Sequence, residues 1–452
     1  MKHLVVAEKP SVGRDIAKVL QCTDKHAGYI SGDDFVVTWG IGHLVTACMP
    51  EEMDPKYVEW KMEDLPIMPD PIPLKVIPET AQQYHIVCDW MNNPEIAGII
   101  CATDAGREGE LIFRYIYQMA DCHKPVKRLW ISSMTPQAIR EGFSQLKSGA
   151  DYDNLYKSAR CRADADWLIG INGSRAYSIQ HSATLSIGRV QSPTLAILVE
   201  REKAIQCFEP EQYQVLHIDY GTFKGEWFTQ AGNGETTSRI PEELKSEMSL
   251  LKDHLIGRQA VVRESIVEHR MIPAPLLYDL TSLQRDANRL YGFTAKRTLS
   301  IAQKLYEERK AITYPRTDSR NLSHDMANTL KGRLESLTLP SWQYAVQKAK
   351  DSAKNLFGRF INDAGVTDHH AIIPTGYCCS EPNWTDGEQK IFDLIARRFI
   401  AMFLPDREVE DQSIISDAMG NNFRSRGQRL VEEGWAEITP VPLEELPSLP
   451  NQ

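Results

Sequence analysis

Residues 314–319, with the sequence Tyr-Pro-Arg-Thr-Asp-Ser, place a phenol two residues before a permanently charged guanidinium. A phenol, with an ordinary pKa of about 10, is a poor nucleophile at neutral pH unless cations stabilise the phenolate and the phosphorus centre that it attacks. Tyr314 is therefore a candidate nucleophile toward phosphate, with Arg316 as the stabilising cation. A tyrosine near arginines is more often a packed or solvated ring, so this interpretation needs a second site.

Three acidic residues could supply that second site, because they follow two short apolar runs. Glu8 comes after residues 4–7 and before a predicted helix with Ser11 as its N-cap, whereas Asp104 and Glu108 come after residues 97–102 and before a predicted helix over about 110–119. The carboxyl ends of parallel strands share one edge of a sheet, so the three carboxylates would surround one point and suit Mg²⁺. Acidic residues also favour helix N-termini without any metal, and this alternative stays open.

Five separated segments then identify a family. They occur in one order along the chain, at residues 6–11 (Val-Ala-Glu-Lys-Pro-Ser), 102–110 (Ala-Thr-Asp-Ala-Gly-Arg-Glu-Gly-Glu), 186–193 (Ser-Ile-Gly-Arg-Val-Gln-Ser-Pro), 312–319 (Ile-Thr-Tyr-Pro-Arg-Thr-Asp-Ser) and 368–375 (Asp-His-His-Ala-Ile-Ile-Pro-Thr). This series resembles type IA DNA topoisomerases of the bacterial topoisomerase III kind, and weaker similarity extends to about residue 439. The resemblance implies an α/β plus α and β fold class. It also implies a multi-domain toroidal core with an N-terminal Toprim α/β domain.

Periodicity and the resemblance together divide the chain into six predicted segments. They are a Toprim metal-binding domain (1–148), the first part of a helical strand-binding domain (149–210), the first part of a β-rich arch (211–272), a helical domain with the tyrosine (273–404), the returning part of the arch (405–439) and an extended tail (440–452).

The resemblance also implies a reaction. Tyr314 would join the 5′ phosphate of a single DNA strand, another strand would pass, and the freed 3′ hydroxyl would reseal the break without ATP, relaxing negative supercoils or decatenating DNA. Arg316 and His369 would stabilise the attacked phosphate. Glu8 would act as an acid at the leaving oxygen, with Lys9 as a phosphate contact.

Metal and strand contacts follow from the same resemblance. Glu8, Asp104 and Glu108 would hold Mg²⁺, which would position the flanking phosphates for religation. DNA-binding residues would be Arg162, Asp166, Arg189 and Gln191, although the last two could instead cap the start of a helix. His369 and His370 are adjacent and would point to opposite faces of an extended segment, so they do not form a simple chelating pair.

Composition limits the class of protein and its partners. The chain has 452 residues, 42% of them hydrophobic and 25% charged, which is typical of a folded protein with several domains. Nine cysteines without a Cys-x-x-Cys pair indicate reduced thiols and no zinc ribbon. We expect no membrane span, no signal peptide and no phosphate loop for a nucleotide. We therefore expect a cytoplasmic protein. By analogy with the family, we expect it to be nucleoid-associated and monomeric.

The net charge of −10 is unusual for a protein that binds a polyanion, since affinity for DNA depends on basic side chains that displace counterions. Charge is unevenly distributed, however. Residues 285–320 contain nine basic and four acidic side chains. The region of the tyrosine is therefore expected to contact single-stranded or underwound DNA, although a charge run is often only a solvated helix face.

Two departures from the family pattern leave a second function open. Gly106 stands where the family's Asp-x-Asp-x-Glu triplet has its middle acid, so one metal ion is expected and not two. The segment that follows in family members and completes the helical domain has no match here, as expected for either a shortened piece or a naturally short relative. The alternative is a DNA-binding, catalytically incomplete fragment; a Toprim nuclease or primase would not explain the tyrosine motif.

Overall fold

The structure, a computed structural model, describes residues 1–131, 134, 136–230, 235–352, 354–367, 369–376 and 384–439. The chain divides into two compact units. The first contains Met1–Cys207, Leu322–Asn328 and Asp363–His370, and the second contains Phe208–Asn321, Thr329–Asn362 and Ala371–Gln452. The predicted tail, residues 440–452, lies outside the described residues, as does Asp368. The six-segment division stays a prediction.

A seven-stranded sheet forms the centre of the first unit, in the order β2-β3-β4-β1-β7-β8-β9. Its strands are β1 (Lys2–Ala7), β2 (Asp24–His26), β3 (Tyr29–Ser31), β4 (Phe35–Trp39), β7 (Ile96–Ala102), β8 (Val126–Arg128) and β9 (Lys147–Ser148). The four central strands β4, β1, β7 and β8 are parallel, whereas the pairings of β2 with β3, of β3 with β4 and of β8 with β9 are antiparallel. The carboxyl ends of β4, β1 and β7 therefore lie at one edge, as the sequence predicts for β1 and β7.

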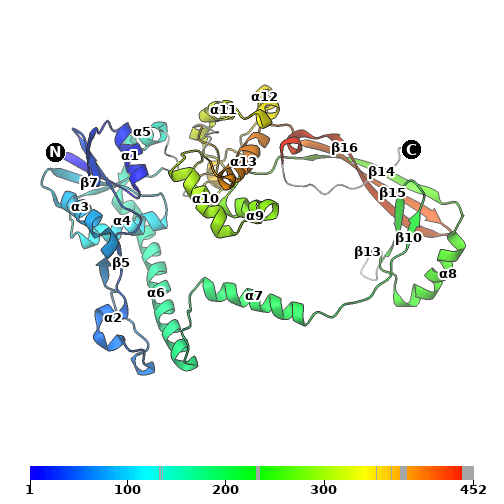
Figure 1. The fold of residues 1–452 in the computed structure, drawn as a ribbon, viewed down its shortest axis with the longest axis horizontal. Coiled ribbons are helices and arrows are strands. Elements are labelled where there is room, and N and C mark those ends of the chain that lie inside the picture. Colours follow the sequence, from blue (N-terminus) through cyan, green and yellow to red (C-terminus); the bar gives the residue numbers. More distant parts are fainter. Residues whose placement is uncertain are drawn as a thin grey trace. The chain divides into compact units, whose positions relative to one another are not determined.

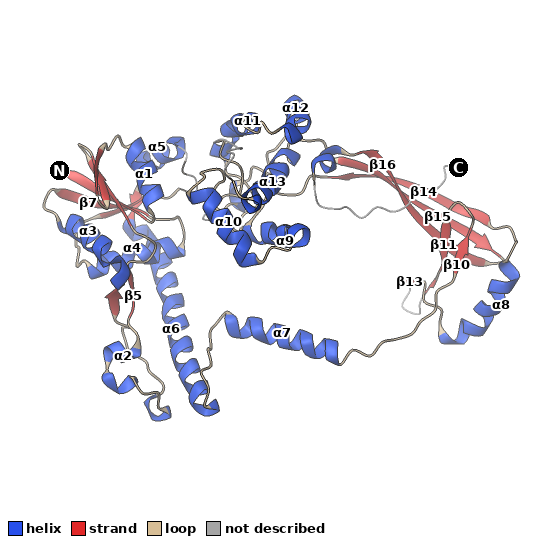
Figure 2. Ribbon diagram, in the orientation of Figure 1, coloured by secondary structure: helices blue, strands red, loops and turns tan. Residues whose placement is uncertain are grey.

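Helices cover both faces of this sheet (Figures 1 and 2). They are α1 (Pro10–Val19), α3 (Ala81–Asn92), α4 (Arg107–Met119) and α5 (Pro136–Ser144). Leu4 and Val6 of β1 pack with α3 and α4, whereas Val5 and Ala7 pack with α1 and α5. Successive side chains of a strand point to opposite faces, so burial on both faces explains the continuous apolar run.

The helix starts differ slightly from the expected ones. α1 begins at Pro10, and its N-cap is Lys9, two residues before the predicted cap Ser11. Proline is favoured in the first helical turn, because the N–H groups of that turn have no partner within the helix and proline lacks this group. α4 begins at Arg107 and not near residue 110, with Gly106 as its N-cap.

The first unit also contains a small hairpin, one short helix and two long helices. These elements are β5 (Val45–Ala47), β6 (Leu74–Val76), α2 (Pro50–Met53), α6 (Asp153–His181) and α7 (Gln191–Gln206). The Trp167 indole of α6 donates a hydrogen bond to the Cys48 carbonyl (3.0 Å), and Asn172 bonds both backbone groups of Ile67. These bonds fix the segment between β5 and β6 against α6.

The second unit has a five-stranded antiparallel sheet in the order β10-β11-β16-β15-β14. Its strands are β10 (His217–Asp219), β11 (Lys224–Trp227), β14 (Val261–Ile272), β15 (Arg407–Ala418) and β16 (Asn421–Glu432), and a separate hairpin pairs β12 (Thr229–Gln230) with β13 (Thr236–Thr237). α8 (Lys245–Leu255), inside a segment predicted as β-rich, packs Met248 with Trp227 and Phe423.

The second unit also contains several helices. They are α9 (Leu280–Tyr291), α10 (Ala295–Glu307), α12 (Gln343–Asp351) and α13 (Asp386–Ala401), while α11 (Ala327–Glu335) begins among the residues grouped with the first unit. Thr385 and Glu388 form a capping box at the start of α13. Glu388 also pairs with Arg309 (2.9 Å), which ties α13 to the segment after α10.

No helix in the described parts of the chain combines the length and apolar character needed to cross a membrane.

Candidate active site

Four predicted site residues lie together in the first unit, where β1 and β7 end. The Asp104 N–H donates a hydrogen bond to Glu8 Oε2 (3.1 Å), and His369 Nε2 lies 3.0 Å from Asp104 Oδ2. The Lys9 Nζ atom is 3.9 Å from Glu8 Oε1 and 3.8 Å from Asp104 Oδ2. Glu8, Lys9, Asp104 and His369 are called the Glu8 cluster below.

The two carboxyl groups of this cluster differ in their affinity for a proton. Burial and then the charge of Asp104 raise the pKa of Glu8 to about 7. Burial opposes ionisation of Asp104 as well, but the hydrogen bond from His369 and the charges of His369 and Lys9 outweigh it, so the pKa of Asp104 lies below its usual value. Near neutral pH the cluster therefore holds one exchangeable carboxyl proton beside a fixed carboxylate.

Glu108, the third predicted metal ligand, binds another residue. It lies in the first turn of α4, and its Oε1 is 2.6 Å from His43 Nε2. This hydrogen bond lowers the pKa of Glu108 and raises that of His43. Sequence reasoning missed His43, although a signal existed: residues 40–43 follow β4, which is parallel to β1 and so ends at the same edge.

The donor atoms fit a hard cation in part. Two carboxylates, Glu8 and Asp104, lie next to each other, and Mg²⁺ is commonly held by one or two carboxylates together with waters and substrate phosphates. Among the residues that the structure describes, no group of three or more His, Cys, Asp or Glu side chains is placed to hold a metal ion. Glu108 would have to leave His43 to become a third ligand.

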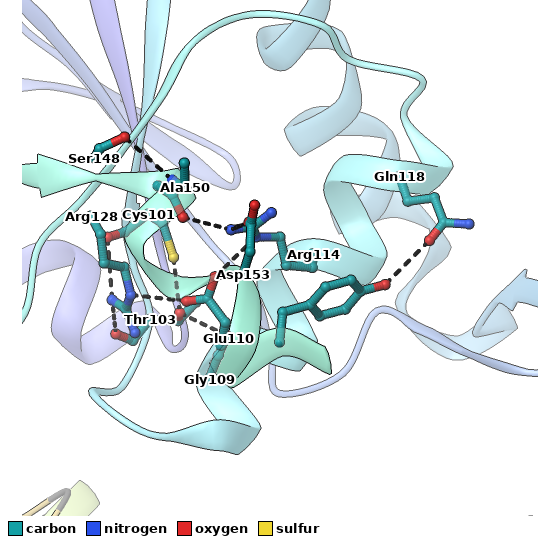
Figure 3. Close-up of polar contacts among 12 residues, drawn as sticks. Cys101, Thr103, Gly109, Glu110, Arg114, Gln118, Arg128, Ser148, Ala150 and Asp153 are labelled. Carbon is teal, nitrogen blue, oxygen red and sulfur yellow. Dashed lines mark hydrogen bonds and ion pairs between the residues drawn. The ribbon is translucent and has the colours of Figure 1, made fainter. Parts of the chain in front are cut away.

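A buried ion pair between Arg128 and Glu110 lies beside Thr103, the residue before Asp104 (Figure 3). Arg128 of β8 and Glu110 of α4 are each 1% exposed, and their side chains pair at 3.1 Å. The Arg128 guanidinium also donates hydrogen bonds to the carbonyls of Thr103 and Asp104, both at 2.7 Å. Sequence reasoning missed Arg128, because a charged residue at the end of a short strand usually faces solvent.

Gly109 is required by a close approach of backbone to backbone. A Cβ atom at this position would lie 2.2 Å from the Asp104 carbonyl oxygen and 2.9 Å from the Asp104 nitrogen. Any side chain would therefore push the Asp104 segment away from Glu8. Gly106 differs, since its φ of −157° and ψ of 178° are extended angles that any residue adopts.

The tyrosine motif lies in the second unit and pairs with the last of the five segments. The Thr313 N–H donates to the Ile373 carbonyl (2.9 Å), the Thr313 hydroxyl donates to the Ala371 carbonyl (3.1 Å), and Ile312 forms a bridge with Pro374. This pairing holds the backbone immediately before Tyr314.

The side chains of the motif differ in exposure. The half-buried Tyr314 ring makes an edge contact with Tyr306, with centroids 5.4 Å apart. Arg316 is exposed and so accessible to an anionic ligand.

Three of the four predicted strand contacts meet on the surface of the first unit. Arg189 Nε lies 2.5 Å from Asp166 Oδ1, and Arg162 Nε lies 3.9 Å from Asp166 Oδ2. Gln191 is the exposed first residue of α7, whose N-cap Val190 makes no side-chain cap. Neither Arg189 nor Gln191 is thus the N-cap of this helix, although capping was the competing interpretation.

Comparison with known proteins gives matches along most of the chain. The family model of the Toprim domain, in general a metal-binding domain, matches residues 3–134, and the DNA topoisomerase family model matches residues 150–451. The DNA topoisomerase 3 of Bacillus subtilis (strain 168) is 47% identical over 438 residues, 97% of this chain and 59% of the relative. That of Shouchella clausii is 46% identical over 436 residues, with 96% and 59% covered.

A solved structure shows the same fold at lower identity. Topoisomerase I from Thermotoga maritima superimposes with a TM-score of 0.64 at 21% identity, covering 98% of this chain and 69% of that one. The chain spans 59% of the length of the two relatives described above. From these matches, the chain belongs to the type IA DNA topoisomerase family, with a Toprim domain at its amino end.

Proposed function

We propose that this chain breaks and rejoins single strands of DNA without ATP, through a covalent bond between Tyr314 and the 5′ phosphate. The Tyr314 oxygen attacks the phosphorus, the bond from phosphorus to the 3′ oxygen breaks, and a phosphotyrosine ester forms. The ester is close in energy to the bond it replaces, so the freed 3′ hydroxyl reverses the reaction after a strand has passed. The net effect is relaxation of negative supercoils or decatenation.

The roles of the side chains follow from their charge and surroundings. Arg316 stabilises the negative charge that develops on the attacked phosphate, and His369 supports the same phosphate. Glu8, with a pKa of about 7, donates a proton to the leaving 3′ oxygen, and Lys9 contacts the neighbouring phosphate. Arg162, Asp166, Arg189 and Gln191 hold the strand.

Mg²⁺ is the metal proposed for the Glu8 cluster. Glu8 and Asp104 would hold it, with Glu108 joining after release from His43. When bound, the ion would position the flanking phosphates and offset their charge. Lys9 Nζ also lies 3.9 Å from Glu8 Oε1 and 3.8 Å from Asp104 Oδ2, so its charge favours ionisation of both carboxyl groups.

The observation that carries the proposal is the Glu8 cluster, in which two carboxyl groups lie beside a lysine and a histidine, and burial together with the charge of Asp104 raises the pKa of Glu8 to about 7. A structural ion pair would not need a protonated partner. We expect the protein to act as a monomer on single-stranded or underwound DNA, without a nucleotide cofactor, in the cytoplasm at the nucleoid.

Covalent capture tests the proposal. A single-stranded oligonucleotide labelled at its 3′ end should remain attached to the protein after a detergent quench, whereas a 5′ label should be released with the other fragment. Tyr314→Phe should abolish the attachment. Retention of the 5′ label, or attachment by the Phe variant, would show that another chemistry operates.

A second candidate is a DNA-binding protein that cannot complete the cycle. It is favoured by one observation, the pairing of Glu108 with His43, which leaves two carboxylates in the cluster. Under this alternative, supercoiled plasmid with Mg²⁺ would be retarded in a gel without any change in linking number.

A further inference from the structure

We propose that the sheet of the second unit carries an additional phosphate-binding pocket for single-stranded nucleic acid, away from the Tyr314 motif. The pocket has a volume of about 290 Å³ and is lined by residues of β10, β11, β13 and β16. Pockets that hold small molecules begin near roughly 300 Å³, so this one suits a single nucleotide unit. The choice of a polynucleotide as the source of phosphate rests on the proposed function.

The charge of the pocket favours an anion. Three basic side chains, Lys224, Arg424 and Arg426, line it against one carboxylate, Glu226. Lys224 is 3.9 Å from Asp219, but no carboxylate in the described part of the chain lies within ion-pairing distance of Arg424 or Arg426. Two guanidinium groups that form no ion pair with the described carboxylates, in one concave site, match the planar, bidentate recognition of a phosphate group.

The strand geometry explains why both guanidinium groups point the same way. Alternate residues of β16 face opposite sides of the sheet, so Phe423 and Ser425 are buried while Arg424 and Arg426 lie on the other face. Glu226 stands opposite Arg424 in the register of β11 and β16. The pocket therefore belongs to the face opposite the core under α8.

A ring and several hydroxyl groups complete the site. The Arg424 guanidinium stacks on the Phe228 ring, with its carbon 4.2 Å from the centroid. An arginine held flat on an aromatic ring presents a surface on which a base can stack. Thr236, Thr237 and Ser238 line the pocket as well and offer neutral donors to phosphate oxygens. A phosphate and its neighbouring base would both find partners here.

Binding of a short oligothymidylate, followed by fluorescence anisotropy as a function of salt, tests the pocket. The protein carries Tyr314→Phe, so that no covalent product forms. Arg424→Gln with Arg426→Gln should weaken binding roughly tenfold at low salt and lower the slope of log Kd against log salt by about 0.7 for each phosphate that the protein no longer neutralises. The matched control is Arg258→Gln with Arg263→Gln, two exposed residues of the same unit outside the pocket.

The control pair should change affinity less than about twofold. Equal losses from the two pairs would mean that only total charge matters, and would overturn the pocket. An oligonucleotide with iodouracil bases should photo-crosslink to the peptide that contains Phe228, and this crosslink should weaken in the Arg424→Gln, Arg426→Gln protein. Crosslinks that avoid this peptide would also overturn it.

Two further measurements separate the possible ligands and the two proposals. The first is competition with inorganic phosphate. If phosphate competes for the site but the pocket variant binds the oligonucleotide without any loss of affinity, the pocket is a small-anion site and the polynucleotide contact is contradicted. Covalent capture by the otherwise unaltered protein runs in parallel. Its failure would refute the Tyr314 chemistry, while the binding comparison would still decide the pocket.

Discussion

At the scale of single residues, Glu8 and Asp104 show how a pair of carboxyl groups acquires two different roles. Glu8 is buried and Asp104 is half-buried, each at the end of one of two neighbouring strands, but His369 and Lys9 favour the charge on Asp104. Asp104 in turn disfavours a second charge on Glu8. Environment separates the two groups, so one is suited to give a proton and the other to remain an anion.

The pKa of Glu8 predicts the pH dependence of cleavage. The protonated form of the acid is depleted as pH rises through about 7, so single-turnover formation of the covalent product should fall by up to roughly tenfold per pH unit above that value. Glu8→Gln should be slower by about 10²-fold or more and lose this pH dependence. A wild-type profile that stays flat from pH 6 to pH 9 would assign the proton to another group.

Arg316 predicts a separation of catalysis from binding. Loss of one charge-stabilising donor typically costs about 3–4 kcal/mol, so Arg316→Ala should slow covalent product formation by roughly 10²- to 10³-fold. Its affinity for single-stranded DNA should change only a few-fold. Arg285→Ala, which removes an exposed charge from α9, is the control. Equal losses of rate and affinity in Arg316→Ala would contradict its role.

Gly106 and Gly109 predict opposite results in the same loop. Gly106→Asp should fold normally, because the backbone there is extended and Asp is a favoured N-cap residue. Gly109→Ala should displace Asp104, since its Cβ would lie 2.2 Å from a carbonyl oxygen. Isothermal titration with Mg²⁺ should show preserved or stronger binding for Gly106→Asp and weaker binding for Gly109→Ala. The reverse order of affinities would contradict the role of Gly109 in placing Asp104.

At the scale of elements, the Arg128–Glu110 pair joins β8 to α4 and holds the loop between β7 and α4. Glu110→Gln leaves a buried guanidinium without its counter-charge, which should destabilise the first unit by about 3–5 kcal/mol. Glu110→Gln with Arg128→Met should cost less than the two single changes added together. Hydrogen exchange of the β7 amides would measure both effects, and additive losses would show that the pair is not coupled.

Glu388 predicts acid sensitivity of the second unit. Burial disfavours its charge, but hydrogen bonds from Arg309 and Thr385 outweigh that cost and lower the pKa from 4.5 to about 2. A lowered folded-state pKa adds stability that is present above pH 4.5 and is lost as pH falls toward 2, about 3 kcal/mol in all. Urea unfolding of Glu388→Gln and wild type should therefore differ most at pH 6, and the gap should narrow at pH 3.

Elements of the parallel sheet were the most predictable from the sequence. Residues 35–39 coincide with β4, and the predicted run at 97–102 lies within β7, because strands buried on both faces leave continuous apolar runs. α8 was missed, since its helical pattern is short and lies among alternating residues. At the site, the proximity of Glu8 and Asp104 could be predicted, because both follow parallel strands that end at the same edge. The pairing of Glu108 with His43 could not be predicted, because it depends on the conformation of the loop after β4.

At the scale of the whole molecule, the property to test is completion of the strand-passage cycle. The chain spans 59% of two relatives described above, and its net charge is −10. If it completes the strand-passage cycle, negatively supercoiled plasmid incubated with Mg²⁺ should give a ladder of topoisomers that disappears with EDTA and with Tyr314→Phe. A ladder that persists in EDTA would remove the need for the proposed ion. An unchanged plasmid that still yields the covalent oligonucleotide would separate cleavage from passage.

The contacts of Arg128 have a practical meaning for protein engineering. Its guanidinium reaches back to the carbonyls of Thr103 and Asp104, more than twenty positions earlier in the chain. A graft of residues 103–110 into a foreign scaffold would therefore bring the acidic side chains without the clamp that orders them. Any transplant of this centre must include β8 together with the loop.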